Sequence, residues 1–384
     1  MKWDLIRSKL ERVDRALDEA IAAAEIPGAV VLARMPRDGE FVEYASARGY
    51  AVVRPERIPM TRQTIFDLAS LTKPMATSTA VLLLVNEDAI GLDDPVAKFL
   101  PTFAESGKEK VTIRHLLTHS SGLQPWRAFH EVVTEQERRG FGRIAGTPAA
   151  KALVLDDILR SGLVHDPGTA AVYGDLDFIA LGAVIEAVAG QPLDEFCQAR
   201  IFVPLGLEHT RFVRLDDHAH SLPELIRRQF AATEDCPWRG RIVWGEVHDP
   251  NASIMGGVAG HAGLFAPADD VMRFATAVLD VYHQRSDVLP GELLRRFLTR
   301  QNLPASSEWT LGWDTPTEGA SSGRYFSQNS VGHLGFTGTS LWIDLQREVV
   351  VVMLTNRVHP VVKHSRFELR PIVHNLLVEA FLAE

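Results

Sequence analysis

The sequence is poor in cysteine, has no long apolar run and carries no excess of positive charge. Cys197 and Cys236 are the two cysteines among 384 residues, too few for a disulfide framework or a multi-thiolate metal site. The longest apolar runs, such as 80–85 and 349–354, fall far below the roughly 18 residues that a membrane-spanning helix needs. The 49 acidic residues outnumber the 40 basic ones, for a net charge of -9. We therefore expect neither a nucleic-acid partner nor a membrane partner.

The composition that remains is that of an ordinary globular protein. Hydrophobic residues make up 46% and charged residues 23% of the chain, which excludes disorder, collagen and a coiled coil. Residues 1–24 carry charges at nearly every turn, with Leu10, Val13, Leu17 and Ile21 at helical spacing. They predict an amphipathic helix and lack the uninterrupted apolar segment of a signal peptide. From this we expect a cytoplasmic protein.

Strand patterns lie near both ends of the chain, and helix patterns lie between them. The expected strands are 29–33, 41–47, 340–343 and 349–354. The expected helices are 71–86, 113–118, 176–189, 268–281 and a closing helix at 366–382. This order predicts an α+β fold in which both termini build one antiparallel sheet flanked by helices.

The same pattern predicts two domains with a cleft between them. We expect residues 1–66 and 285–384 to form a discontinuous α/β sheet domain. Residues 67–284 are expected to form a mostly α-helical domain inserted into it, with the active site in the cleft. Segments 127–150 and 213–246, with Trp238 and Trp244, are expected to form loops over that cleft.

Ser70 and Lys73 give the strongest local signal for chemistry. They stand three residues apart just before an apolar run, so on a helix they share one face within side-chain reach. A serine hydroxyl becomes a good nucleophile when a neighbouring base takes its proton, and burial can lower the pKa of a lysine for that role. The first helical turn also places the backbone N–H of Ser70 where it can stabilise an oxyanion. A helix cap and a solvated lysine are the alternative interpretation.

Tyr173 and Asp175 stand immediately before another predicted helix. A phenol is both donor and acceptor, so Tyr173 can relay a proton to a leaving group. Asp175 can hold Lys73 in place, or simply cap the helix that follows. Tyr173 taken alone is equally compatible with a core aromatic residue.

Glycines interrupt segment 332–339, which leads into a predicted strand. Glycine weakens a strand, so its presence here suggests that a ligand approaches the backbone edge closely. His333 would then face the substrate with a side chain whose charge changes near neutral pH. A glycine-rich turn with a surface histidine is the alternative.

Six segments together resemble the serine beta-lactamase and penicillin-binding-protein superfamily, most closely its class C branch and the serine esterases of that fold. Their order and spacing both fit over about 310 residues. The segments are 26–29 (IPGA), 66–74 (FDLASLTKP), 113–123 (IRHLLTHSSGL), 167–169 (PGT) with Tyr173, 256–265 (GGVAGHAGLF) and 333–339 (HLGFTGT).

The resemblance implies a serine hydrolase that works through an acyl-enzyme on a small ester or amide, with no metal and no cofactor. Ser70 would attack an acyl carbonyl, and Lys73 and Tyr173 would share the role of base. The backbone N–H groups of Ser70 and Phe336 would form the oxyanion hole. Residues expected to contact the substrate or shape its pocket are His333, Gly335, Asp175 and His261. The oligomeric state stays open.

Two departures from the family pattern bear on the substrate. Beta-lactamases and cell-wall peptidases usually carry Lys-Thr-Gly where this chain has His333, Leu334 and Gly335, and use it to hold a substrate carboxylate. Asp175 replaces an asparagine, and a carboxylate beside Lys73 favours the charged amine, which makes Tyr173 the better base. We therefore expect a carboxylesterase with weak promiscuous beta-lactamase activity. A beta-lactamase, a D-Ala-D-Ala carboxypeptidase or D-aminopeptidase, and a penicillin-binding sensor without turnover are the alternatives.

Two other motifs compete weakly for the site. Segment 319–323 matches the G-x-S-x-G pattern of α/β-hydrolases around Ser321, but polar residues surround it where that pattern needs a strand and a helix. His115 and His119 have a spacing that can bind zinc, yet no glutamate follows His115. We interpret the first segment as a loop and both histidines as packing or surface residues.

Overall fold

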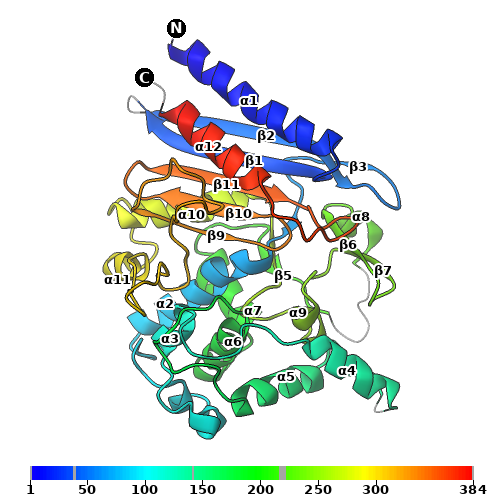
Figure 1. Cartoon of the computed structure of the whole chain (residues 1–384), viewed down its shortest axis with the longest axis vertical. Coiled ribbons are helices and arrows are strands. Elements are labelled where there is room, and N and C mark those ends of the chain that lie inside the picture. Colours follow the sequence, from blue (N-terminus) through cyan, green and yellow to red (C-terminus); the bar gives the residue numbers. More distant parts are fainter. Residues whose placement is uncertain (1, 38–39, 141, 216–221, 383–384) are drawn as a thin grey trace.

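A six-stranded antiparallel sheet forms the upper part of the molecule in Figure 1. The computed structural model describes residues 2–37, 40–140, 142–215 and 222–382. The strands follow the spatial order β3-β2-β1-β11-β10-β9. Their bounds are β1 (Gly28–Arg37), β2 (Glu40–Val52), β3 (Ile58–Pro59), β9 (Ser330–Leu334), β10 (Ser340–Asp344) and β11 (Val349–Thr355).

Both ends of the chain meet in the middle of this sheet. β1 pairs with β11 in antiparallel register, with Ala29 opposite Thr355 and Arg34 opposite Val350. The predicted α+β fold is therefore confirmed. All six strands lie inside the two segments assigned to the sheet domain, while the domain boundaries themselves stay a prediction.

The central strands are apolar along their whole length because both faces of the sheet are covered. In β1, Val30 and Leu32 face the large core beneath the sheet, whereas Val31 faces a smaller core on the other side. In β11, the alternation of Val350 and Val351 follows the same rule. α1 and α12 pack together over the smaller core, and α10 lies on the opposite face (Figure 1).

Twelve α-helices are described in all. They are α1 (Lys2–Ala22), α2 (Thr79–Asn86), α3 (Ile113–Leu117), α4 (Phe129–Arg138), α5 (Pro148–Arg160), α6 (Leu176–Ala189), α7 (Leu193–Cys197), α8 (Glu224–Arg227), α9 (Pro250–Ile254), α10 (Ala268–Tyr282), α11 (Gly291–Phe297) and α12 (Leu369–Phe381). Within the described residues, no single helix is long and apolar enough to cross a bilayer, and the pair Leu176–Ala189 and Leu193–Phe202 reaches that length only with a bend of 75°.

Small sheets also occur within the inserted part. One has the order β4-β8-β5, and the other pairs β6 with β7. Their bounds are β4 (Phe66–Asp67), β5 (Arg211–Phe212), β6 (Ala232–Cys236), β7 (Arg241–Trp244) and β8 (Leu264–Ala266).

Three local predictions need correction. The helix expected at 71–86 begins as a 3₁₀ turn, η1 (Ala69–Leu71), continues as a wide π-helical turn, η2 (Lys73–Ser78), and becomes α-helical only in α2. The loop expected at 127–150 contains α4, and the loop expected at 213–246 contains the β6–β7 pair. Segment 129–138 is amphipathic, so its helix has a local signal that the loop prediction overlooked. The short strands β6 and β7 are defined by their pairing with each other.

Leu17 tests the contribution of the small core on the α1 side. It is fully buried among α12 and sheet residues. We expect Leu17→Ala to lower the free energy of unfolding in urea by about 2–5 kcal/mol, because a buried leucine leaves a cavity when truncated. Glu11→Ala, an exposed change on the same helix, should stay within about 0.5 kcal/mol of the parent. Equal effects of the two changes would contradict this packing.

Candidate active site

Ser70 lies in a tight turn that links β4 to the helical segment beneath the sheet. The preceding residue, Ala69, is buried and has a φ of +47°, a conformation that costs a non-glycine residue on the order of 1–3 kcal/mol. Two hydrogen bonds hold it: the Ala69 N–H donates to Asp67 Oδ1 at 2.8 Å, and Thr72 Oγ1 donates to Ala69 O at 2.7 Å. This strained turn presents Ser70 at the wall of a cavity.

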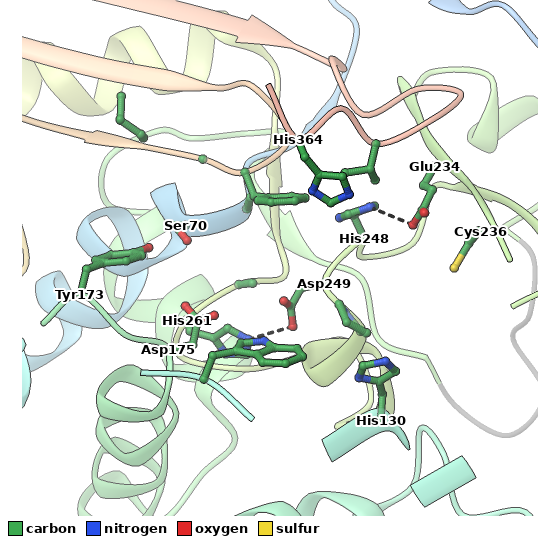
Figure 2. Close-up of a pocket in the computed structure, with 18 of the residues that line it drawn as sticks. Ser70, His130, Tyr173, Asp175, Glu234, Cys236, His248, Asp249, His261 and His364 are labelled. Atoms are coloured by element: carbon green, nitrogen blue, oxygen red, sulfur yellow. Dashed lines mark hydrogen bonds and ion pairs between the residues drawn. The ribbon is translucent and has the colours of Figure 1, made fainter. Parts of the chain in front are cut away.

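Lys73 is fully buried one turn further along the chain. Its Nζ lies 2.9 Å from Ser70 Oγ, 2.8 Å from Tyr173 OH and 2.8 Å from Asp175 Oδ1. Figure 2 shows the hydroxyl groups of Ser70 and Tyr173 turned toward each other. The structure thus brings together the three residues predicted to be catalytic, and adds Asp175 to them.

Close backbone approach fixes the loop that carries Tyr173. The Asp175 N–H donates to Pro125 O at 2.7 Å, and a Cβ on Gly174 would lie 2.6 Å from Pro125 Cα. The Tyr173 ring stacks on Trp309, with centroids 5.5 Å apart. Asp175 stands at the N-cap position of α6 but makes no side-chain capping bond, so of its two predicted roles the structure shows the contact with Lys73.

The charges in this cluster favour an ammonium ion and a phenol at rest. Burial alone would lower the pKa of Lys73, but the nearby Asp175 and Tyr173 outweigh it and raise that pKa above its usual value. The Tyr173 ring is partly exposed to the cavity, while its hydroxyl contacts the buried amine. Burial raises the pKa of the phenol, and the positive charge of Lys73 only partly offsets the rise.

The end of β9 forms the opposite wall of the site. Thr337 Oγ1 donates to Asp67 O at 2.8 Å, and Thr339 Oγ1 donates to Leu68 O at 3.0 Å, so this loop is clamped against the turn that carries Ser70. Gly335 permits the close fit, because a Cβ there would lie 2.5 Å from Leu68 O. Phe336 follows directly, is 59% exposed and lines the same cavity as Ser70.

His333 is buried beside this wall and is not a surface residue. Its Nδ1 lies 2.9 Å from Leu334 O, and its ring centroid lies 5.8 Å from that of Tyr173. Burial and the charge of Lys73 hold the pKa of this imidazole well below its usual value. His333 therefore presents an uncharged ring to the cavity at neutral pH.

His261 contributes through two different groups. Its carbonyl oxygen lies 3.3 Å from Lys73 Nζ, and its Nε2 lies 2.9 Å from Asp249 Oδ1. Ligand atoms of Asp175, Asp249 and His261 lie within 4.8 Å of one another, a spacing that can hold a metal ion. Each carboxylate already has a partner: Lys73 contacts Asp175, and His261 contacts Asp249. The negative charges of the two acids are therefore not left uncompensated in the site.

The cavity beside Ser70 has a volume of about 850 Å³ and extends well beyond the nucleophile. Figure 2 shows it running from Ser70 and Tyr173 past Asp249 and His248 to Cys236 and His130. Trp238 lines it and packs on His130 with ring centroids 5.2 Å apart. Trp244 lies elsewhere and donates to Phe230 O, so the expectation that both tryptophans cover the cleft holds only for Trp238.

The alternative nucleophile lies apart from this cavity. The carbonyl of Ser321 accepts a hydrogen bond from His374 Nδ1 at 2.8 Å. His374 belongs to α12 on the far face of the sheet. The interpretation of segment 319–323 as a loop agrees with this position.

Sequence reasoning missed Asp177 and Trp309 near Tyr173, and it named His119 only as a packing or surface histidine. His119 is buried with its ring centroid 4.8 Å from that of Tyr173, and Asp177 lies behind it on α6. Trp309 supports the other side of the phenol ring. Asp177 did leave a signal, because it is an acid in the first turn of a helix whose following eight residues are all uncharged.

Comparison with known proteins agrees with the fold. The sequence profile of the Beta-lactamase family matches residues 13–372. The chain belongs to the beta-lactamase family. It is a serine hydrolase of the class C-like fold, as the resemblance of its motifs predicts.

Two bacterial proteins are similar to this chain over most of its length. A protein of Escherichia coli (strain K12) named "Putative D-alanyl-D-alanine carboxypeptidase" is 33% identical over 82% of this chain and 75% of its own. An "N-acetylmuramyl-L-alanine amidase" of Bacillus subtilis (strain 168) is 31% identical over 91% of this chain and 81% of its own.

Solved structures of lower identity share the fold. The hydrolase EstCE1, which has promiscuous acyltransferase activity, aligns with a TM-score of 0.73 at 23% identity, covering 97% of this chain and 99% of its own. The simvastatin synthase LovD of Aspergillus terreus aligns with a TM-score of 0.70 at 20% identity, covering 97% and 98%.

Gly335→Ala tests the fit between β9 and the nucleophile turn. A Cβ would push the Phe336 N–H away from Ser70, so we expect Ser70 to react with a fluorophosphonate roughly 100-fold more slowly, the loss typical of one oxyanion donor. Gly162→Ala is the matched control, since nothing lies within 4 Å of a Cβ there. Labelling of the Gly335 variant at the parental rate would show that this wall does not serve the nucleophile.

Proposed function

We propose that the protein is a carboxylesterase that forms an acyl-enzyme on Ser70 and has weak beta-lactamase activity. The observation that carries the proposal is the contact of Lys73 Nζ with Ser70, Tyr173 and Asp175 at the wall of a large cavity. Nucleophile, proton acceptor and counter-charge all lie within hydrogen-bond reach of the one amine, an arrangement that acyl transfer can use.

In the proposed mechanism Tyr173 is the general base. Ser70 Oγ attacks the ester carbonyl, and its proton passes to the Tyr173 oxygen in the phenolate form that the Lys73 ammonium stabilises. The carbonyl oxygen becomes an oxyanion against the N–H groups of Ser70 and Phe336. Tyr173 returns the proton to the leaving alcohol, and a water activated in the same way releases the acid and restores Ser70.

This assignment makes the reaction faster at higher pH. The base must lose a proton, and the pKa values of Tyr173 and Lys73 are both raised in the folded protein. The fraction of enzyme in the reactive form therefore grows as the pH rises through neutrality.

The wall formed by β9 supports a substrate without a carboxylate next to the bond that breaks. His333 is uncharged, and Leu334 offers no side-chain hydrogen bond. Beta-lactams and peptides ending in D-alanine both carry a carboxylate there, so each would lose a charged hydrogen bond worth about 1.5–3 kcal/mol. A neutral ester has no carboxylate at this position and so loses no such hydrogen bond.

An amidase acting on a substrate that carries a ring is a second candidate. The supporting observation is the far end of the cavity, where Trp126, His130 and Trp238 provide aromatic faces beyond the reach of a short acyl chain. Aromatic faces bind flat or ring-shaped groups well. The name of the Bacillus subtilis relative, an N-acetylmuramyl-L-alanine amidase, is consistent with this alternative.

Replacement of the nucleophile gives a direct test. We expect Ser70→Ala to lower hydrolysis of a 4-nitrophenyl ester by at least about 10⁴-fold, because the covalent step is lost. Ser321→Ala should keep the parental rate, since its carbonyl and not its hydroxyl makes the recorded contact with His374. Loss of activity in the Ser321 variant alone would place the nucleophile elsewhere.

A substrate panel separates the candidate functions. Across 4-nitrophenyl esters, kcat/KM should rise roughly threefold to fourfold per added methylene until the cavity is filled, as apolar burial predicts. Nitrocefin should be turned over roughly 10- to 100-fold more slowly than the best ester, and a D-alanyl dipeptide not at all.

Two results from the same panel of substrates would overturn the proposal. Faster cleavage of the dipeptide than of any ester would favour the carboxypeptidase. A stable mass increase on Ser70 after mixing with penicillin, with no product over hours, would favour the sensor without turnover.

A further inference from the structure

His119 holds both neighbours of Tyr173 in the chain. Its carbonyl oxygen accepts the Val172 N–H at 2.8 Å, and its side-chain Nδ1 accepts the Gly174 N–H at 3.3 Å. The imidazole is 1% exposed and packs against Tyr173 and Trp309. His119 also has a φ of +55°, a strained conformation that a non-glycine residue keeps only when its surroundings fix it.

Asp177 is the side-chain partner of His119. It lies on α6 and is 4% exposed. Its Oδ1 accepts a hydrogen bond from Ser121 Oγ, and its Oδ2 lies 3.3 Å from His119 Nδ1. The chain Ser121–Asp177–His119 therefore ends at the backbone on either side of the phenol.

The contacts at Nδ1 determine where the protons are. A ring nitrogen that accepts an N–H has its single lone pair facing that donor and carries no proton of its own. Asp177 Oδ2 then makes a hydrogen bond to the same nitrogen only if the carboxyl group is protonated. Because two donors share the one lone pair of Nδ1, each hydrogen bond is long, and both distances are 3.3 Å.

We propose that His119 and Asp177 are positioning residues for Tyr173 and act as an uncharged pair, in which the Asp177 carboxyl donates its proton to His119 Nδ1. This inference rests on the proposed role of Tyr173 as the base. Neither side chain touches the substrate. They fix the direction of the phenol toward Ser70 through the backbone of residues 172–174 and through ring contact.

The electrostatic surroundings agree with an uncharged pair. Burial raises the pKa of Asp177 to about 8, with Asp175 acting in the same direction and with Ser121, His165 and Lys73 opposing it. Burial and Lys73 lower the pKa of His119 to about 3, with Asp175 opposing. Both groups are therefore neutral near pH 7.

Ionisation of Asp177 would undo this arrangement. The carboxylate would accept a hydrogen bond from a proton on His119 Nδ1. That proton would compete with the Gly174 N–H for the same space, so the hydrogen bond from Gly174 would be lost. Since the unionised form is the one that holds Tyr173, the rise of activity with pH should level off above about pH 8. Below about pH 8 activity should rise as the base loses its proton. Above it, loss of the Asp177 proton should offset the continued gain of base, because the pKa of Tyr173 is raised above its usual value.

Paired substitutions separate positioning from general structural damage. Asp177→Asn keeps an acceptor for Ser121 and a donor for His119, whereas Asp177→Leu keeps neither. His119→Asn keeps a δ-position acceptor and tolerates φ above zero, whereas His119→Ala loses the acceptor. Asp270→Asn is the control, because Asp270 is a buried carboxylate of α10 that accepts from Thr210 at 2.9 Å, away from the Ser70 cavity.

The readouts are kcat and KM for a 4-nitrophenyl ester and the rate of fluorophosphonate labelling of Ser70, each from pH 6 to 10, with thermal unfolding of every variant. We expect Asp177→Leu and His119→Ala to lower kcat and labelling roughly 10- to 100-fold with KM within about twofold, the size of effect a misplaced group produces. Asp177→Asn and His119→Asn should keep most of kcat at pH 7. Activity of Asp177→Asn should keep rising above pH 8, whereas activity of Asp270→Asn should level off as the parent's does.

Three results would overturn the proposal. An Asp177→Asn variant as impaired as Asp177→Leu at pH 7 would show that the site needs a charged carboxylate. A folded His119→Ala variant with parental labelling would show that Tyr173 is positioned without it. A parental plateau above pH 8 in Asp177→Asn would assign the plateau to another group. Because the fluorophosphonate needs no particular substrate, failure of the esterase assay alone would count against the proposed function and not against this pair.

Discussion

The buried amine of Lys73 is the point at which the active site is assembled. An ammonium ion removed from water is costly unless it is paired and hydrogen-bonded, and here three oxygen atoms from Ser70, Tyr173 and Asp175 surround it. These atoms come from segments about 100 residues apart in the chain. The need to compensate one charge thus brings the nucleophile, the phenol and the carboxylate to one place.

A second constraint is the contact between the end of β9 and the strained turn at Ala69. The sheet ties together the two ends of the chain, and its edge strand β9 delivers Gly335 and Phe336 beside Ser70. Threonine hydroxyls on one side and backbone carbonyls on the other clamp the two segments. Because the sheet is buried on both faces, this wall is rigid, as preorganised stabilisation of an oxyanion requires.

Chemistry and selectivity are separated in this site. The cluster around Lys73 is compatible with any acyl group, whereas the uncharged His333 and the aromatic far end of the cavity bear on which substrate fits. The beta-lactamase family fold therefore accounts for the reaction type. The proposal of a neutral ester or a ring-bearing amide as substrate rests on a few residues of the cavity wall.

Residue patterns predicted much of the architecture. Amphipathic periodicity located α1, α10 and α12, a long apolar run located α6, and strand patterns located the paired strands of the sheet, because burial imposes these patterns directly. The loop prediction was wrong in segment 127–150, although α4 is amphipathic, and in segment 213–246, where β6 and β7 are short and are defined by their pairing with each other.

The sequence by itself determined the nucleophile, its neighbouring amine and the phenol as candidates, since their spacing and surroundings match a chemical need that local structure can satisfy. Only the tertiary structure decided that Asp175 contacts Lys73 without capping its helix, and that His119 is enclosed behind Tyr173 and faces Asp177. Whether a polar side chain caps, pairs or stays neutral depends on which distant segment packs against it and how much water that segment removes, and no local pattern records either quantity.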